Sequence, residues 1–188
     1  SNASAVTISG SKVIVGGTCE IRNSGVPTLS VTDICITRYN GDGSLDTTFN
    51  GTGKANYSIT AGNHSVAGIA MDGDRIVVGG SCNTSVISWQ YPQLFCALRL
   101  TASGVLDTTF DADGGQTVQL SNQYAVVTEV GLEGSRVVLA GFCHSANGDR
   151  MCAARFNENG SLDTSLFGAG TLIANAPTDS YRYANALI

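Results

Sequence analysis

The sequence predicts an all-β protein built from β-propeller-type repeats, with three four-stranded antiparallel blades and the first strand of a fourth. Two observations lead to this fold class. Charged residues make up only 13% of the chain and glycine is abundant, with 23 residues, a composition that favours strands and turns over helices. In addition, one long motif occurs three times along the chain.

The repeated motif runs from an arginine through a turn to a Leu-Asp pair. Its copies are RYNGDGSLDTTF at 38–49, RLTASGVLDTTF at 99–110 and RFNENGSLDTSL at 155–166. The turn letters vary, whereas the arginine, one glycine, the leucine and the aspartate are constant. Such a pattern predicts one structural unit that occurs three times.

Four strands can be placed in each unit. The blocks SKVIVGGTC (11–19), DRIVVGGSC (74–82) and SRVVLAGFC (135–143) are β-branched runs that predict the second strand. The apolar alternations before them, AVTISG, AGIAMDG and TEVGLEG, predict the first strand. The segment leading into the motif supplies the third, and segments 54–59, 116–120 and 171–174 predict a weaker fourth.

These strands divide the chain into repeats at 4–60, 61–121 and 122–178, and residues 179–188 resemble the first strand of a fourth repeat. Residues 1–3 have the sequence of an expression-tag scar and are left out of the prediction. Four-stranded repeats of this length are typical of propeller blades, which cover one another face to face. Since propellers usually have four to eight blades, we expect further repeats or a homo-oligomer formed through exposed blade faces.

The phrase RYNGDGSLDTTF, preceded by an IVVGG-type strand, resembles the delta-60 repeat of bacterial secreted and surface proteins. The resemblance covers nearly the whole chain in three copies and implies a β-propeller domain of unknown function. Two departures stand out: Ser103-Gly104-Val105 replaces Asp42-Gly43-Ser44, and Leu166-Phe167 stands where a lone phenylalanine is expected. The family supplies no catalytic residues.

Six cysteines form three matched pairs, because each unit has one cysteine after its small-residue block and one just before the motif arginine. We predict one disulfide per blade: Cys19 with Cys35, Cys82 with Cys96, and Cys143 with Cys152. If the two cysteines of a unit lie directly opposite each other, the register sets Val15 against Tyr39, Val78 against Leu100 and Leu139 against Phe156.

The alternative for the cysteines is three pairs of buried free thiols. A zinc site is not expected, because His64 and His144 do not occur at matching positions. Disulfides would place the protein in an oxidising compartment, secreted, periplasmic or at the cell surface.

The first turn carries side-chain oxygens at alternate positions, as calcium loops do: Asn40, Asp42, Ser44 and Asp46. Calcium requires six to eight oxygen ligands, and among these positions only the final aspartate is constant in the other copies. We therefore predict a turn and no metal site, with calcium in the first copy as the alternative.

The constant residues of the motif then receive structural roles. The leucines Leu45, Leu106 and Leu162 are expected to plug the core after the turn. Each arginine is expected to form a partly buried ion pair with the aspartate of its own copy, which also accepts backbone N–H bonds. The predicted pairs are Arg38 with Asp46, Arg99 with Asp107, and Arg155 with Asp163.

Charge and motifs restrict the function. A net charge of −5 with only ten Lys and Arg residues argues against nucleic acid, and no apolar run is long enough to insert in a membrane. No nucleophile elbow, phosphate loop or zinc-protease motif is present, so no catalytic residue is predicted. His64 and His144 are expected at the surface, and Glu20, Asp33 and Glu129 are the acids left over for a glycosidase-like pair.

The segment enclosed by the second cysteine pair, NTSVISWQYPQLF, contains the only tryptophan. Trp89 and Tyr91 could contact a glycan or a protein ligand, or they could cover a neighbouring blade. We therefore expect a non-catalytic module of a secreted or cell-surface bacterial protein that serves binding, adhesion or scaffolding. The alternative is part of a carbohydrate-active propeller enzyme whose site needs further blades.

Overall fold

A computed structural model of the chain describes residues 1–22, 30–85, 93–145 and 148–174. Within these residues the chain forms three antiparallel sheets of four strands each, with strand orders β1-β2-β3-β4, β5-β6-β7-β8 and β12-β11-β10-β9. We call these sheets unit 1, unit 2 and unit 3. This arrangement confirms the predicted all-β fold of four-stranded antiparallel blades.

Each unit uses its strands in chain order. Unit 1 consists of β1 (Asn2–Ser9), β2 (Lys12–Arg22), β3 (Ser30–Tyr39) and β4 (Lys54–Tyr57). Unit 2 consists of β5 (His64–Asp72), β6 (Arg75–Asn83), β7 (Gln93–Leu100) and β8 (Gly115–Val118). Unit 3 consists of β9 (Ala125–Glu133), β10 (Arg136–Ser145), β11 (Gly148–Phe156) and β12 (Thr171–Ile173).

The first residues of the chain belong to the fold. Asn2 and Ala3 pair with Thr18 and Gly17 in β2, so β1 begins inside the segment that the sequence prediction left out. The segment 179–188, predicted to begin a fourth repeat, lies outside the described residues.

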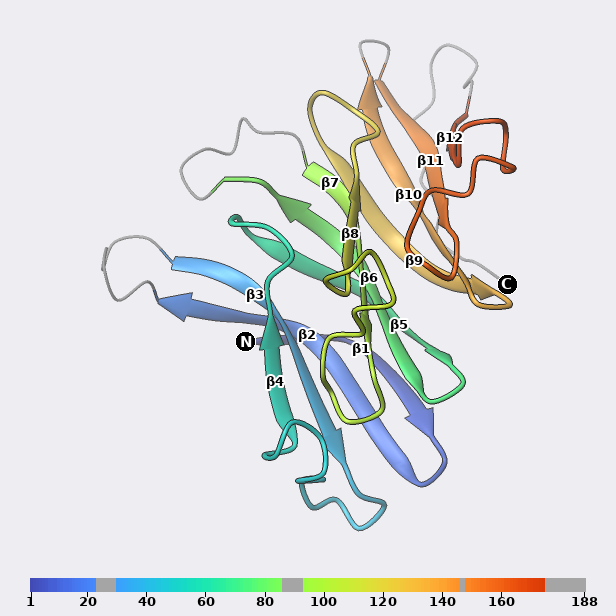
Figure 1. The fold of residues 1–188 in the computed structure, drawn as a ribbon. Coiled ribbons are helices and arrows are strands. Elements are labelled where there is room, and N and C mark those ends of the chain that lie inside the picture. Colours follow the sequence, from blue (N-terminus) through green and yellow to red (C-terminus); the bar gives the residue numbers. More distant parts are fainter. Residues whose placement is uncertain (23–29, 86–92, 146–147, 175–188) are drawn as a thin grey trace.

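The three units stack face to face, with unit 2 in the middle (Figure 1). Strand β5 contacts β1, β2 and β3 of unit 1, and β9 makes the corresponding contacts with β5, β6 and β7 of unit 2. Strands β6 and β7 are buried along nearly their whole length. The β-branched run of the middle unit therefore forms a strand that is covered on both faces, whereas in the run of unit 1 only Ile14 is buried and Val13 and Val15 are partly buried.

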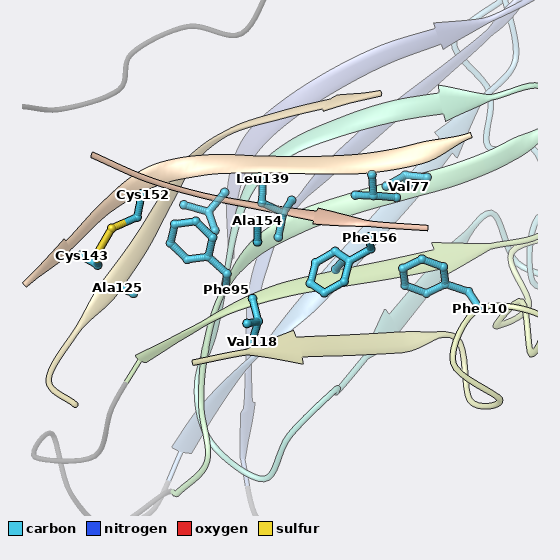
Figure 2. Close-up of a cluster of buried hydrophobic side chains, with 13 residues drawn as sticks. Val77, Phe95, Phe110, Val118, Ala125, Leu139, Cys143, Cys152, Ala154 and Phe156 are labelled. Atoms are coloured by element: carbon cyan, nitrogen blue, oxygen red, sulfur yellow. A yellow bond between two sulfur atoms is a disulfide. The ribbon is translucent and has the colours of Figure 1, made fainter. Parts of the chain in front are cut away.

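Two hydrophobic clusters fill the spaces between the units. The cluster between units 1 and 2 contains Ile14, Ile36, Phe49, Ile76 and Leu98 among its buried residues. The cluster between units 2 and 3 is built around Phe95, Phe110, Leu139, Ala154 and Phe156, and Figure 2 shows the Cys143–Cys152 disulfide at its edge. Burying each large apolar side chain contributes about 1.5–3 kcal/mol, so the stack of units, more than any single sheet, stabilises the fold.

One glycine of the small-residue block is constant because the first strand of each unit has a β-bulge beside it. A Cβ on Gly17 would lie 1.8 Å from Asn2 O, on Gly80 1.7 Å from Ser65 O, and on Gly141 1.9 Å from Val126 O. No side chain fits at these distances, so every copy of the repeat keeps glycine there.

The predicted core plug is wrong for Leu106, which is 37% exposed, whereas Leu162 is partly buried and packs against the cluster between units 2 and 3. Phe49 and Phe110, which stand three residues after the aspartate, are fully buried. The leucine instead forms a single bridge back to the third strand, as in the pair Tyr39 and Leu45. Its Cβ lies close to a glycine of positive φ, such as Gly53, so the leucine packs on the turn and leaves the core to the aromatic ring.

The cysteines pair as predicted, but the predicted register is wrong by two residues. Cys35 lies opposite Gly17, and Cys19 lies opposite Asp33. Units 2 and 3 have the same offset, so the disulfides Cys19–Cys35, Cys82–Cys96 and Cys143–Cys152 join diagonal positions. Their Cα–Cα distances of 5.8, 6.1 and 5.9 Å lie within the usual range for a disulfide.

Candidate functional site

Each predicted Arg–Asp pair is present in the structure. The Nε–Oδ2 distance is 2.8 Å for Arg38 and Asp46, 2.7 Å for Arg99 and Asp107, and 2.8 Å for Arg155 and Asp163. The other oxygen of each aspartate accepts the backbone N–H of the residue two positions later, at 3.1 Å. The motif aspartates are therefore fully used inside their own turns.

The surroundings of these aspartates favour the charged form. Burial raises the pKa of Asp107, but hydrogen bonds from Thr109 and the charge of Arg99 outweigh it, so that the pKa lies below its usual value. For Asp46 the largest cause of the lowered pKa is the hydrogen bond from Thr48, assisted by Lys12 and Arg38. Such firmly ionised carboxylates are suited to ion pairing and unsuited to acid catalysis.

The turn oxygens are also used internally. Asp42 Oδ1 accepts hydrogen bonds from the backbone N and the Oγ of Ser44, at 2.9 and 2.7 Å. Asn159 and Ser161 repeat the arrangement in unit 3. Across the described ranges, no group of three or more His, Cys, Asp or Glu side chains is placed to hold a metal ion. Calcium binding at the first turn stays a hypothesis that needs a direct measurement.

At the end of the sheets opposite the motif turns, beside the disulfides, the facing side chains vary from unit to unit. The residue after the first cysteine faces a polar partner on the third strand in every unit: Glu20 faces Thr32, Asn83 faces Gln93, and His144 faces Asp149. The frame is constant while these pairs differ from unit to unit. Varied side chains on a repeated rigid frame are typical of a recognition surface.

A pocket of about 440 Å³ lies at this end, where units 1 and 2 meet. Its lining residues share hydrogen-bonding side chains: Glu20, Ser30, Thr32, Asn63, His64, Ser65, Ser81, Asn83 and Gln93. Unit 1 contributes the first three, and unit 2 and the link before it contribute the others. Among the described lining residues Glu20 is the one carboxylate, and none is a lysine or an arginine.

His64 belongs to a group of hydrogen-bonded residues that joins units 1 and 2 at the pocket. The prediction that it lies at the surface is wrong. It is 3% exposed, and its Nε2 accepts the backbone N–H groups of Ile59 and Thr60 at 3.0 and 3.1 Å. Nδ1 lies 3.1 Å from Thr32 O, which can only accept, so the ring proton sits on Nδ1 and the imidazole is neutral. Burial lowers the pKa of His64, against the opposing effects of Thr32 and Asp33.

Thr32 and Asn63 form the other hydrogen bonds that join the two units here. Asn63 Oδ1 accepts the backbone N–H of Thr32 at 2.9 Å, and Thr32 Oγ1 donates to His64 O at 2.8 Å. These bonds fix the relative position of β3 and β5 at the floor of the pocket. A ligand in the pocket would therefore meet walls that are already in place.

Asn83 is the exceptional residue of the pocket. It is 5% exposed, and its backbone N and O are bonded to Asn63 O and to the N of Gly62. Its side-chain Oδ1 is buried, and no described residue donates a hydrogen bond to it. An unpaired buried amide oxygen costs free energy, and a donor that a ligand brought to it would reduce that cost.

The leftover acids do not form a catalytic pair. Asp33 is buried and accepts bonds from Ser58 Oγ at 2.5 Å and Asn56 Nδ2 at 3.2 Å. Glu20 is exposed at the pocket, whereas Glu129 lies on β9 of unit 3, opposite Ala140. Sequence reasoning missed Asn83 and Asn63, because neither residue belongs to a motif.

Unit 3 has a different polar cluster at the same strand positions. The buried Asp149 Oδ1 lies 2.8 Å from His144 Nδ1 and accepts a bond from Tyr124 OH at 2.9 Å. The rings of Tyr124 and His144 are stacked with centroids 4.9 Å apart. The carboxylate of Asp149 thus orients the His144 ring. Ser121 Oγ donates to the backbone carbonyl group of His144, so this bond does not orient the ring.

Trp89 and Tyr91, the predicted ligand contacts, lie outside the described residues.

Comparison with solved structures gives a likeness to a mutant of the Bombyx mori GH32 beta-fructofuranosidase BmSUC1 in complex with sucrose. The identity is 10% and the TM-score 0.39, over 86% of this chain and 34% of that one, so this chain spans about a third of that enzyme. No curated protein matches. The family described as "Domain of unknown function (DUF5122) beta-propeller" matches residues 11–49 and 136–166, which hold the glycine block and the motif of units 1 and 3.

Proposed function

We propose that this protein is a non-catalytic binding module of the delta-60 repeat type, in a secreted or cell-surface protein. Its ligand is a neutral, hydroxyl-rich molecule, such as a carbohydrate, that enters the pocket between units 1 and 2. The observation that carries the proposal is the buried and unpaired Oδ1 of Asn83 in the wall of that pocket.

The chemistry of the lining favours this ligand class. Amides and hydroxyls, which make up most of the lining, can both donate and accept hydrogen bonds, as the hydroxyl groups of a sugar do. An anionic ligand would find no cation among the lining residues that the structure describes and would meet the carboxylate of Glu20. A ligand hydroxyl, in contrast, can donate to Asn83 Oδ1 without leaving a charge buried.

The disulfides give the pocket a rigid frame. Cys19 and Cys82 directly precede Glu20 and Asn83, and each is bonded to the neighbouring strand. A site that is already rigid loses less conformational entropy on binding. The three disulfides also support a place outside the reducing cytosol, and no helix among the described residues has the length and hydropathy of a membrane span.

The test is a screen of neutral oligosaccharides by glycan array, followed by calorimetry with the best ligand. We expect Asn83→Leu to weaken binding at least tenfold, which corresponds to about 1.4 kcal/mol. The variant should melt no lower than the natural protein, because it removes a buried unpaired oxygen.

Two glutamines provide the matched control. Gln93→Ala, in the pocket, should weaken binding, whereas Gln119→Ala, at an exposed position bonded to Asn122, should not. Unchanged binding in Asn83→Leu would rule out this pocket as the site, and a screen without any bound glycan would rule out the ligand class.

A second candidate function, part of a carbohydrate-active propeller enzyme, rests on His144. Its Nδ1 lies 2.8 Å from the carboxylate of Asp149, the way in which a general base is commonly oriented. Hydrolysis of a bound oligosaccharide that is lost in His144→Gln would favour this candidate over a pure binding module.

A further inference from the structure

The two described contacts between units, units 1–2 and units 2–3, are built in the same way. In each, the motif arginine of the earlier unit reaches the turn of the later unit. Arg38 Nη1 donates to Ala102 O, and Arg99 Nη1 donates to Glu158 O at 2.6 Å. Ala102 and Glu158 occupy the same position in their copies of the motif.

A backbone hydrogen bond accompanies each arginine. The N–H of Asn50 donates to Ser103 O at 2.8 Å, and the N–H of Asp111 donates to Asn159 O at 2.9 Å. Asn50 and Asp111 each follow the buried phenylalanine of their motif and have φ values of 49° and 52°. The contact between units is thus specified by the repeat itself.

An apolar contact completes the arrangement. Ile69 of unit 2 packs on Gly16 of unit 1, where a Cβ would lie 2.4 Å from Ile69 Cδ1. Val130 of unit 3 packs on Gly79 of unit 2, where a Cβ would lie 2.5 Å from Val130 Cγ2. The later unit therefore presents a branched side chain, and the earlier unit receives it on a glycine.

Units 2 and 3 each use turn carbonyl groups and a branched side chain to contact the unit before them. Unit 1 carries the same groups on the face turned away from unit 2. Val6 occupies the position of Ile69 and Val130, since it pairs with Val15 as they pair with Val78 and Leu139. Val6 is 66% exposed, and Ile8, two residues further along β1, is 69% exposed. The carbonyl groups of residues 41 and 42 correspond to the acceptors in the turns of units 2 and 3.

Unit 3 carries the groups with which units 1 and 2 contact the unit after them. Phe167 follows its motif as Asn50 and Asp111 do, and its φ of 50° is the same. Arg155 Nη1, which corresponds to the donor atoms of Arg38 and Arg99, is bonded to the exposed Glu133 at 2.6 Å. Ala140 stands at the position of Gly16 and Gly79.

We propose that these two sets of groups meet between copies of this chain, so that unit 1 of one copy packs on unit 3 of a second copy, head to tail. In this contact Val6 lies against Ala140, Arg155 exchanges Glu133 for the carbonyl group of residue 41, and the N–H of Phe167 donates to the carbonyl group of residue 42. A heterologous contact of this kind closes into a ring when the rotation permits and otherwise extends.

Ala140 limits the strength of the contact. In the two described contacts a Cβ at this position would come within 2.5 Å of the incoming side chain, so the strand bearing Val6 has to shift outward. Replacing Ala140 with glycine removes this obstacle. The contact between copies is therefore weak in the natural sequence and becomes tight in Ala140→Gly.

The test is sedimentation equilibrium of the full chain over a range of concentrations. We expect concentration-dependent association of the natural protein and association at least tenfold tighter for Ala140→Gly. Val6→Asp, at an exposed position, should abolish association in both backgrounds without lowering the melting temperature. Val105→Asp, in the exposed turn of unit 2, is the matched control and should leave association unchanged.

Two results would overturn the proposal. One is that the natural protein and Ala140→Gly are both monomeric at every concentration. The other is association that persists in Val6→Asp, which would assign it to another surface. The proposal is independent of the ligand pocket, because both sets of groups lie away from Asn83 and its neighbours.

Discussion

Arg99 Nε donates to Asp107 Oδ2 at 2.7 Å, and Arg99, 1% exposed, is the largest fully buried side chain among the described residues. Its Nη1 and Nη2 donate to Glu158 O and Thr109 Oγ1, and its guanidinium lies over the Phe110 ring at 4.9 Å. A buried guanidinium is costly unless its charge is paired and its N–H groups are hydrogen-bonded. The aspartate of the Leu-Asp motif supplies the counter-charge for this buried arginine.

Asp107→Ala is expected to lower the free energy of unfolding by about 3 kcal/mol, because it leaves the buried Arg99 without its counter-charge. For a chain of this size the melting temperature should fall by about 6–12 °C. Urea denaturation and thermal melts measure the change. Asp163→Ala is the comparison: its partner Arg155 is more exposed than Arg99, so its loss should be smaller. Equal losses in the two variants would contradict this account of burial.

Calcium is expected to leave the melting temperature of the natural protein unchanged. The reason is that the oxygens of the first turn already accept hydrogen bonds, as Asp42 Oδ1 does from Ser44. Thermal melts with calcium and with a chelator measure the effect. A rise in melting temperature with calcium that disappears in Asp46→Ala would show instead that the turn binds the ion.

Much of the fold could be predicted because the repeat shows each position three times. The glycine beside the β-bulge, such as Gly17 or Gly80, is constant since any Cβ would collide with backbone. The cysteines were paired by the same comparison. Residues that are identical in all three repeats thus indicate the structural requirements inside each unit.

The comparison of repeats gives wrong predictions at positions where the units differ and at positions where the strand geometry decides the pairing. Leu166 replaces the phenylalanine in the third copy, which hid Phe49 and Phe110 as the true core residues. The cysteine register also depends on geometry, because direct and diagonal pairs of strand positions both suit a disulfide and the sequence does not separate them.

The pocket could not be predicted because it depends on contacts between units. His64 is buried because Thr32, in another unit, closes over it, and Asn83 becomes an unpaired acceptor only when the two units are assembled. Neither property leaves a local pattern in the chain.

Stability is expected to fall as the pH drops below about 6.5, and His64 is the cause. Burial lowers the pKa of His64 in the folded state, whereas in the unfolded chain it titrates near its ordinary value. Below that value the unfolded state binds more protons than the folded state, so the stabilisation present at higher pH is progressively lost. The motif aspartates, whose pKa values are also lowered, act only in a more acidic range, below about pH 4.

His64→Gln isolates this effect, because His144 and all the carboxylates remain in the variant. Urea denaturation at several pH values between about 7.5 and about 5 should give a smaller pH dependence for His64→Gln than for the natural protein. Identical slopes would show that the buried imidazole does not control stability in this range.

Gly79→Ala is expected to lower the free energy of unfolding by about 1–3 kcal/mol. The added Cβ would lie 2.5 Å from Val130 Cγ2 and 2.6 Å from Leu139 Cδ2, both side chains that pack unit 3 on unit 2. Neither can move far, because Leu139 is fully buried in the cluster between these units. The matched substitution Gly73→Ala, in a turn with no atom within 4 Å of the added Cβ, tests backbone strain alone, since φ is 60° there. A loss in Gly79→Ala that is partly restored by Val130→Ala would assign it to the contact between units, and a loss that Val130→Ala leaves unchanged would contradict that assignment.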